Sequence, residues 1–117
     1  MNIGIEIREH FSLVHIDGDL SGEDVDKLGA AIDRLMSKGY RNVVLELTGV
    51  SEMDAKGVGT LVNHWNHVRF KRGDLRIVGL NGRLAHLFRT MGVEGLFGKE
   101  RTLAELMERQ ASSAVSA

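Results

Sequence analysis

Residues 43–59, VVLELTGVSEMDAKGVG, join a short apolar run to a loop and then to a glycine-rich segment. The run at residues 43–47 is almost entirely β-branched or leucine, which is typical of a strand covered on both faces. Beyond the loop, apolar residues recur at helical spacing, as Val58, Leu61, Val62, Trp65 and Val68. This order predicts a strand, a loop and an amphipathic helix, the unit from which parallel α/β sheets are built.

The segments on either side continue the alternation of strands and helices. Ile3, Ile5 and Ile7 alternate with polar residues or glycine and predict the first strand of a β-hairpin, with its partner near residues 13–16. Further strands are expected at residues 75–80 and, briefly, at Leu96-Phe97. Helices are expected at residues 21–38, from residue 57 to about 70, at residues 84–91, and from a Thr102 cap to about residue 109.

The predicted fold class is therefore α/β, a sandwich with a mixed, mostly parallel sheet of four to five strands and about four helices. With 117 residues, the chain has room for one domain, which we expect at residues 1–110. The last residues, 111–117, are Ala, Ser and one Val, and are expected to form a disordered tail.

Composition argues against several kinds of function. The chain has no cysteine, which excludes disulfides, thiolate metal sites and cysteine nucleophiles and favours a cytoplasmic location. Fifteen basic and sixteen acidic residues give a formal charge of -1, which offers no field to hold nucleic acid or an anionic membrane. No apolar run approaches the roughly 20 residues of a membrane span, so no direct membrane insertion is expected.

Function in sheets of this kind usually lies on the loops that follow the carboxyl ends of the strands. Gly57 and Gly59 each give up about 1 kcal/mol of helix propensity relative to alanine, so we expect a close approach or a tight helix start there. Asp54 is well placed to cap this helix. Lys56 stands near the positive end of the helix dipole, which is unfavourable by up to about 1 kcal/mol. For these residues a purely structural or solvated role remains open.

Signals for other chemistry are weak. The glycine-rich helix start lacks both GxxxxGK[ST] and GxGxxG, so a small-ligand or nucleotide-binding domain rests only on a helix N-terminus. His64 and His67 lie three residues apart, but without further ligands at metal spacing a polar helix surface is favoured. No GxSxG motif or acid–base constellation is defined. We expect no cofactor, no metal and no enzymatic activity.

At residues 43–59 the chain resembles the signature of STAS domains, particularly bacterial anti-sigma factor antagonists. Gly18-Asp19-Leu20 is similar to the Gly-Glu-Leu-Asp that precedes the first helix of the family, and the strand and helix at residues 75–93 are similar to its later half. The resemblance covers nearly the whole chain. It implies a STAS fold and a signalling module in transcription regulation that binds a serine-kinase anti-sigma factor or a related regulator.

The resemblance also implies where the partner binds. In the family a loop with the pattern Asp-Ser-Ser/Thr-Gly-Leu-Gly starts a helix, and phosphorylation of the serine before the glycine switches binding off. Here Ala55 and Lys56 stand at the small residue and the phosphoacceptor serine, and Ser21 stands at an aspartate of the family. The implied surface, not gated by phosphorylation at position 56, consists of Asp19, Ser21, Met53, Asp54, Ala55, Lys56, Gly57 and Val58.

The sequence leaves alternative functions and assembly states open. One is a STAS accessory subunit of a lipid-importing ABC transporter or of a stressosome-like assembly. A homodimer and phosphorylation of Ser21 or Ser51 are likewise open.

Overall fold

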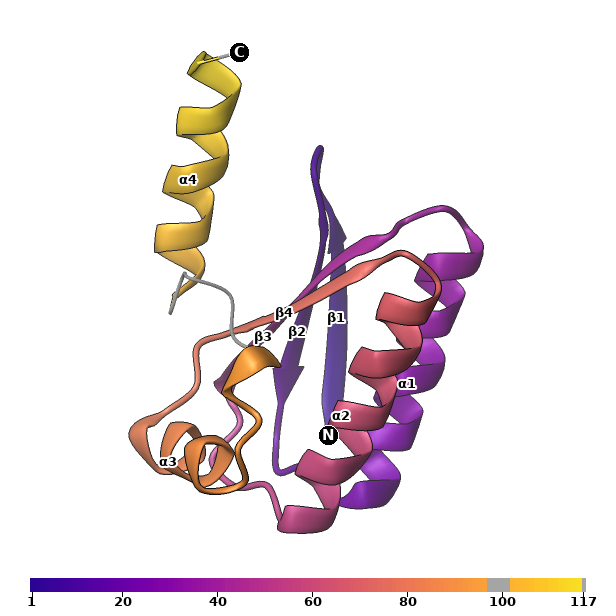
Figure 1. The fold of residues 1–117 in the computed structure, drawn as a ribbon, viewed down its shortest axis with the longest axis vertical. Helices are drawn as coiled ribbons and strands as arrows, with labels where there is room; N and C mark the ends of the chain where they lie inside the picture. The colour runs from indigo at the N-terminus through magenta and orange to yellow at the C-terminus, as the bar shows by residue number, and fades with distance from the viewer. Residues whose placement is uncertain (97–101, 117) are drawn as a thin grey trace.

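The computed structural model describes residues 1–96 and 102–116 (Figure 1). In chain order the elements are β1 (Asn2–Ile7), β2 (Ser12–Asp17), α1 (Gly22–Ser37), β3 (Asn42–Gly49), α2 (Ala55–Phe70), β4 (Asp74–Val78), α3 (Gly82–Thr90), the 3₁₀ helix η1 (Glu94–Leu96) and α4 (Leu103–Ser116).

The four strands form one mixed sheet in the order β1-β2-β3-β4. β1 and β2 are the predicted antiparallel hairpin, whereas β2 with β3 and β3 with β4 are parallel. Helix α1 connects β2 to β3, and α2 connects β3 to β4. The carboxyl ends of three strands therefore lie at the same edge of the sheet, and the predicted α/β fold is confirmed.

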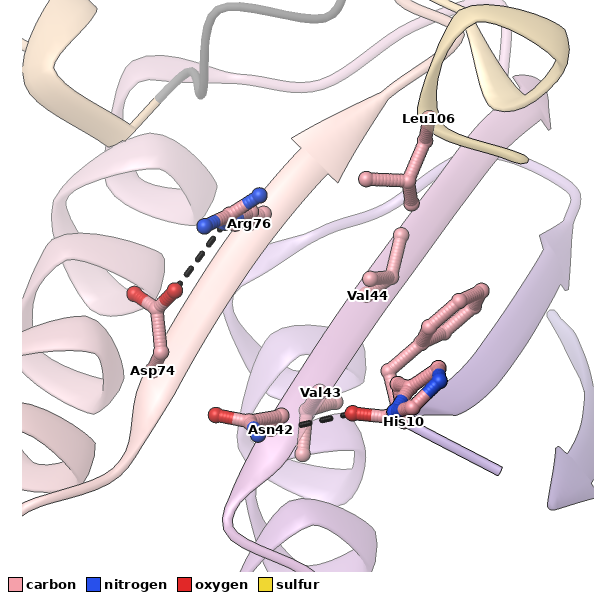
Figure 2. Close-up of a pocket in the computed structure, with 8 residues that line it drawn as sticks. His10, Asn42, Val43, Val44, Asp74, Arg76 and Leu106 are labelled. Carbon is pink, nitrogen blue, oxygen red and sulfur yellow. Dashed lines mark hydrogen bonds and ion pairs between the residues drawn. The ribbon is translucent and has the colours of Figure 1, made fainter. Parts of the chain in front are cut away.

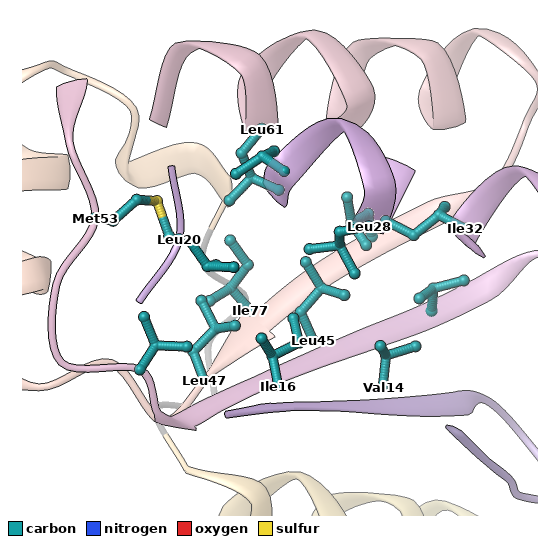
Figure 3. Close-up of a cluster of buried hydrophobic side chains, with 14 of the residues drawn as sticks. Val14, Ile16, Leu20, Leu28, Ile32, Leu45, Leu47, Met53, Leu61 and Ile77 are labelled. Carbon is teal, nitrogen blue, oxygen red and sulfur yellow. The ribbon is translucent and has the colours of Figure 1, made fainter. Parts of the chain in front are cut away.

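The main core lies between the sheet and helices α1 and α2. Figure 3 shows strand side chains such as Val14, Leu45 and Ile77 reaching toward Leu28 and Leu61 of the helices. All five of these side chains are almost completely buried. The hydrophobic effect of this layer holds α1 and α2 against the sheet.

A smaller apolar cluster covers part of the opposite face. It consists of Phe11, Leu13, Val44, Val78 and Leu106, the last of which belongs to α4. Successive residues of β3 thus enter different cores, Val43 the larger one and Val44 the smaller. Burial on both faces explains the continuous apolar run at residues 43–47.

Several boundaries differ from expectation. The strand expected at residues 75–80 ends at Val78, and the helix expected at residues 84–91 begins at Gly82. The strand predicted at Leu96-Phe97 is wrong for Leu96, which ends η1, while Phe97 lies outside the described residues. Two apolar residues next to Gly95 are too short a run to fix a strand. Helix α2 begins at Ala55 rather than at Gly57, and α4 continues to Ser116, through alanines that favour helix.

In the part of the chain that is described, no helix is long and apolar enough to span a membrane.

Candidate functional site

Main-chain hydrogen bonds hold two loops together at the carboxyl edge of the sheet. The N–H of Gly18 donates to the carbonyl oxygen of Gly49 at 3.0 Å, and the N–H of Leu20 donates to that of Glu52 at 3.1 Å. Leu20 and Met53 form an isolated parallel bridge, and both side chains are buried. The loop before α1 and the loop before α2 therefore form one unit, which we call the paired loops (residues 18–21 and 50–54).

The start of α1 is held by a capping box. The N–H of Asp24 donates to Ser21 Oγ at 3.4 Å, and the N–H of Ser21 donates to Asp24 Oδ2 at 3.1 Å. The Asp24 carboxylate accepts hydrogen bonds from the main-chain N–H and from the hydroxyl of Ser21. These bonds, of which the main-chain one has the larger effect, hold the pKa of Asp24 below its ordinary value of 3.8. The predicted Ser21 cap is confirmed, and its hydroxyl lies exposed on the molecular surface.

Asp54 caps α2 in the same way. Its Oδ1 accepts a hydrogen bond of 2.6 Å from the N–H of Gly57. The carboxylate satisfies one of the helix's unpaired N–H groups and places negative charge at the positive end of the helix dipole. The predicted cap is confirmed, and the Asp54 side chain also remains exposed at the edge of the paired loops.

Lys56 connects the starts of the two helices. Its Cγ, Cδ and Cε atoms each lie 3.0 Å from the point where a Cβ on Gly22 would be. The alkyl chain therefore rests on the first residue of α1, although Lys56 is exposed. Among the described residues no ion pair holds its ammonium group. A positive charge next to helix N-termini does not stabilise them, so this charge stays available to a partner.

The two glycines at the start of α2 have different surroundings. A Cβ on Gly57 would lie 3.0 Å from Met53 Cγ and 3.1 Å from the carbonyl oxygen of Leu20. Because glycine has no Cβ, Met53 and the Leu20 carbonyl group can approach position 57 closely. This is the close approach that we expected from the low helix propensity of glycine. A Cβ on Gly59 would meet nothing within 4 Å. Nothing in the structure explains a glycine at position 59.

A third loop closes this edge of the sheet. Asn81 caps α3 by accepting a 2.8 Å hydrogen bond from the N–H of Leu84, and its amide donates to the carbonyl oxygens of Val50 and Ser51 at 3.4 and 3.3 Å. Arg83 forms an ion pair with Glu52. The sequence predicted the Asn81 cap but not these three contacts with the paired loops, because the partners are about thirty residues apart in the chain.

The eight residues of the predicted surface divide into an exposed set and a buried set. Those exposed are Asp19, Ser21, Asp54, Ala55 and Lys56. Those buried are Met53, Gly57 and Val58, of which Met53 is 5% exposed and Val58 is 0% exposed. The buried residues therefore support the surface from below, and the exposed ones form it.

The histidines of α2 face the neighbouring helix. His64 Nε2 lies 3.4 Å from Asp26 Oδ1, and His67 Nε2 lies 3.7 Å from Asp33 Oδ1, both on α1. In residues 1–96 and 102–116, no three His, Cys, Asp or Glu residues form a group that could hold a metal ion.

A small pocket lies at the opposite edge of the sheet, beneath α4 (Figure 2). Its polar groups bind one another: the Asn42 amide donates to the carbonyl oxygen of His10 at 3.4 Å, and Arg76 Nε donates to Asp74 Oδ2 at 3.0 Å. Asn42, Asp74 and Arg76 are thus bonded to partners within the protein. The paired loops are therefore the stronger candidate site.

Comparison with known proteins identifies the family to which the chain is similar. A family model of the STAS domain matches residues 2–106. The anti-sigma-B factor antagonist of Listeria monocytogenes is 32% identical over 100 residues, which cover 82% of this chain and 87% of that protein.

Solved structures share the fold at lower identity. An anti-sigma factor antagonist from Mycobacterium paratuberculosis superposes with a TM-score of 0.76 at 16% identity, over 92% of each chain. The unphosphorylated form of the anti-sigma factor antagonist SpoIIAA superposes with a TM-score of 0.69 at 17% identity, over 94% of this chain and 98% of that one.

Proposed function

Because the chain belongs to the STAS domain family and resembles anti-sigma factor antagonists, we propose that it is a regulatory protein-binding module. Its proposed partner is a serine-kinase anti-sigma factor or a related regulator, which it binds in the cytoplasm without catalysing a reaction. The bridge between Leu20 and Met53 carries the proposal, because it joins two helix starts into one exposed surface.

The proposed binding surface is small and polar, with a cation near its centre. Asp19, Ser21, Asp54 and Ala55 are exposed around Lys56, whose alkyl chain rests on Gly22. A lysine seated in this way loses less side-chain freedom when a partner binds than a free one would. We expect the partner to place an acidic side chain opposite the ammonium group.

Position 56 is proposed to occupy the place of the phosphoacceptor serine of the antagonists. A lysine has no hydroxyl group to accept a phosphoryl group from a serine kinase. It also contributes one positive charge, where a phosphoserine would contribute nearly two negative charges. Binding through this surface is therefore proposed to be independent of phosphorylation at position 56.

Calorimetric titration tests the binding surface. The protein is titrated with each serine-kinase anti-sigma factor that the source organism encodes, and we expect a one-to-one complex with one of them. Lys56→Glu should weaken that complex about tenfold or more, since it reverses a charge at the interface. It should not lower the melting temperature, because a carboxylate is more favourable than an ammonium group at the N-terminus of a helix.

Lys71→Glu is the matched control, because it makes the same charge change at the opposite end of α2. It should leave the affinity unchanged. Failure of every kinase to bind would contradict the proposed partner class. An unchanged affinity for Lys56→Glu would place the interface elsewhere.

Phosphorylation is tested separately with the kinase that binds. After incubation with ATP, the intact mass of the wild-type protein should show no added phosphate, whereas Lys56→Ser should gain one. A stoichiometric phosphate on Ser21 or Ser51 of the wild-type protein would contradict binding that is independent of phosphorylation.

A further inference from the structure

Strand β1 forms an open edge of the sheet. In the described part of the chain it pairs with β2 alone, whereas the strand at the other edge, β4, packs against η1 (Figure 1). The outward main-chain groups of β1 are therefore free to bind another strand.

On the face of the sheet that packs against α1 and α2, the side chains of β1 are apolar. Ile3 and Ile5 pair with Ile16 and Val14, which belong to the main core, so the isoleucines point to that same face. Ile3 packs partly against the core, but Ile5 is 48% and Ile7 is 49% exposed. Edge strands usually carry an inward charge, a proline or a bulge that blocks pairing, and this face of β1 has none of these.

We propose that β1 pairs with β1 of a second copy of this chain, antiparallel about a two-fold axis through Ile5. The segment 3–7, Ile-Gly-Ile-Glu-Ile, has an apolar pattern that is symmetric about Ile5. In this register Ile5 faces its own copy and Ile3 faces Ile7 of the second copy, all on the helix face. The pairing covers both exposed isoleucines and joins two four-stranded sheets into one.

Neighbouring registers fit less well. A shift by one residue would turn the isoleucines of the second copy to the opposite face. A shift by two residues in one direction would place Glu6 opposite Glu6, which is unfavourable. A shift by two residues in the other direction would place Ile7 of one copy opposite Met1 of the other, and Met1 lies outside β1. In the proposed register Glu6 faces Gly4, so no like charges are directly opposed.

The dimer is independent of the proposed partner binding. A two-fold axis across antiparallel strands reverses the direction of one sheet relative to the other, so the paired loops of the two copies lie at opposite ends of the joined sheet. A single strand pairing buries less than the roughly 1,600 Å² of a standard interface, so the dimer should be weak and depend on concentration.

Disulfide formation tests the register directly, because the chain contains no cysteine. Ile5→Cys places two thiols on the axis, where facing Cβ atoms lie about 4.5–5.5 Å apart, close enough for a disulfide after a small adjustment. It should form a disulfide-linked dimer in mildly oxidising buffer. Ile3→Cys alone should not, since its two copies are about 13 Å apart along the strands. A mixture of Ile3→Cys and Ile7→Cys should form a mixed disulfide.

Phe70→Cys is the control for random collision, because Phe70 is 88% exposed and lies on α2. Cross-linking of Ile5→Cys no faster than that of Phe70→Cys would overturn the proposal.

Sedimentation equilibrium tests the dimer without cross-linking. The wild-type protein and Phe70→Lys should dimerise as concentration rises, and Ile5→Lys should stay monomeric with its circular dichroism unchanged. A wild-type protein that is monomeric at every concentration, or a folded Ile5→Lys that still dimerises, would overturn the proposal.

Discussion

Asp54 has two separate properties, its ability to accept a hydrogen bond and its charge. The ability to accept a hydrogen bond contributes to the fold, because Asp54 Oδ1 accepts a 2.6 Å hydrogen bond from the N–H of Gly57. Asp54→Ala removes the cap and should lower the free energy of unfolding by about 0.5–2 kcal/mol, measured by urea denaturation.

Asp54→Asn separates the two properties. An amide oxygen caps a helix about as well as a carboxylate, so this variant should retain most of the stability. A urea midpoint that is the same for Asp54→Ala and wild type would mean that the cap does not contribute in solution.

The caps show which residue contacts a sequence can predict. Ser21, Asp54 and Asn81 each bind a main-chain N–H three residues further on, so residue type and spacing are sufficient to find them. The contact of Lys56 with Gly22 joins the first turns of two different helices and depends on the sheet that brings these helices together. No local pattern could predict it.

At the scale of whole elements, α1 and α2 approach closely at one glycine. A Cβ on Gly29 would overlap the imidazole ring of His64, and both residues lie inside their helices. Glycine in a helix interior is unfavourable by about 1 kcal/mol relative to alanine, so its presence here is explained by the close contact. Periodicity predicted both helices, but it could not predict this glycine, because the ring that requires it lies on the other helix.

A double-mutant cycle tests the contact between the helices. Gly29→Ala should destabilise the wild-type protein by about 1–3 kcal/mol, because the ring must move. In a His64→Ala background the same substitution should instead stabilise the protein by up to about 1 kcal/mol. Urea denaturation of the four variants gives both values. An equal effect in the two backgrounds would contradict the contact.

For the molecule as a whole, the second face of the sheet contains a partly buried carboxylate. Burial alone would raise the pKa of Glu46, but the hydrogen bond from the Thr48 N–H at 2.9 Å and the contact with His15 Nδ1 at 3.1 Å outweigh it. The pKa of Glu46 therefore lies below its ordinary value of 4.5. The predicted fold places this residue on β3 but could not give its partners, which depend on the strand register.

The lowered pKa links Glu46 to acid stability. Because the folded protein binds this proton less tightly than the unfolded chain, the carboxylate stabilises the fold fully above pH 4.5 and loses this effect as pH falls through the folded value. Glu46→Gln should therefore reduce the loss of stability between about pH 5 and pH 3, measured by urea denaturation at each pH. Glu9→Gln, which makes the same change of charge in the exposed turn after β1, is measured alongside as the control.

The paired loops are joined through main-chain atoms, and this has a consequence for protein engineering. The bonds from Gly18 to Gly49 and from Leu20 to Glu52 use no side-chain atom. Asp19 and Ala55 can therefore be randomised in a combinatorial library, together with Lys56, without removing any of the bonds that join the loops. The fold then serves as a display scaffold of 117 residues without cysteine, from which binders of new specificity can be selected.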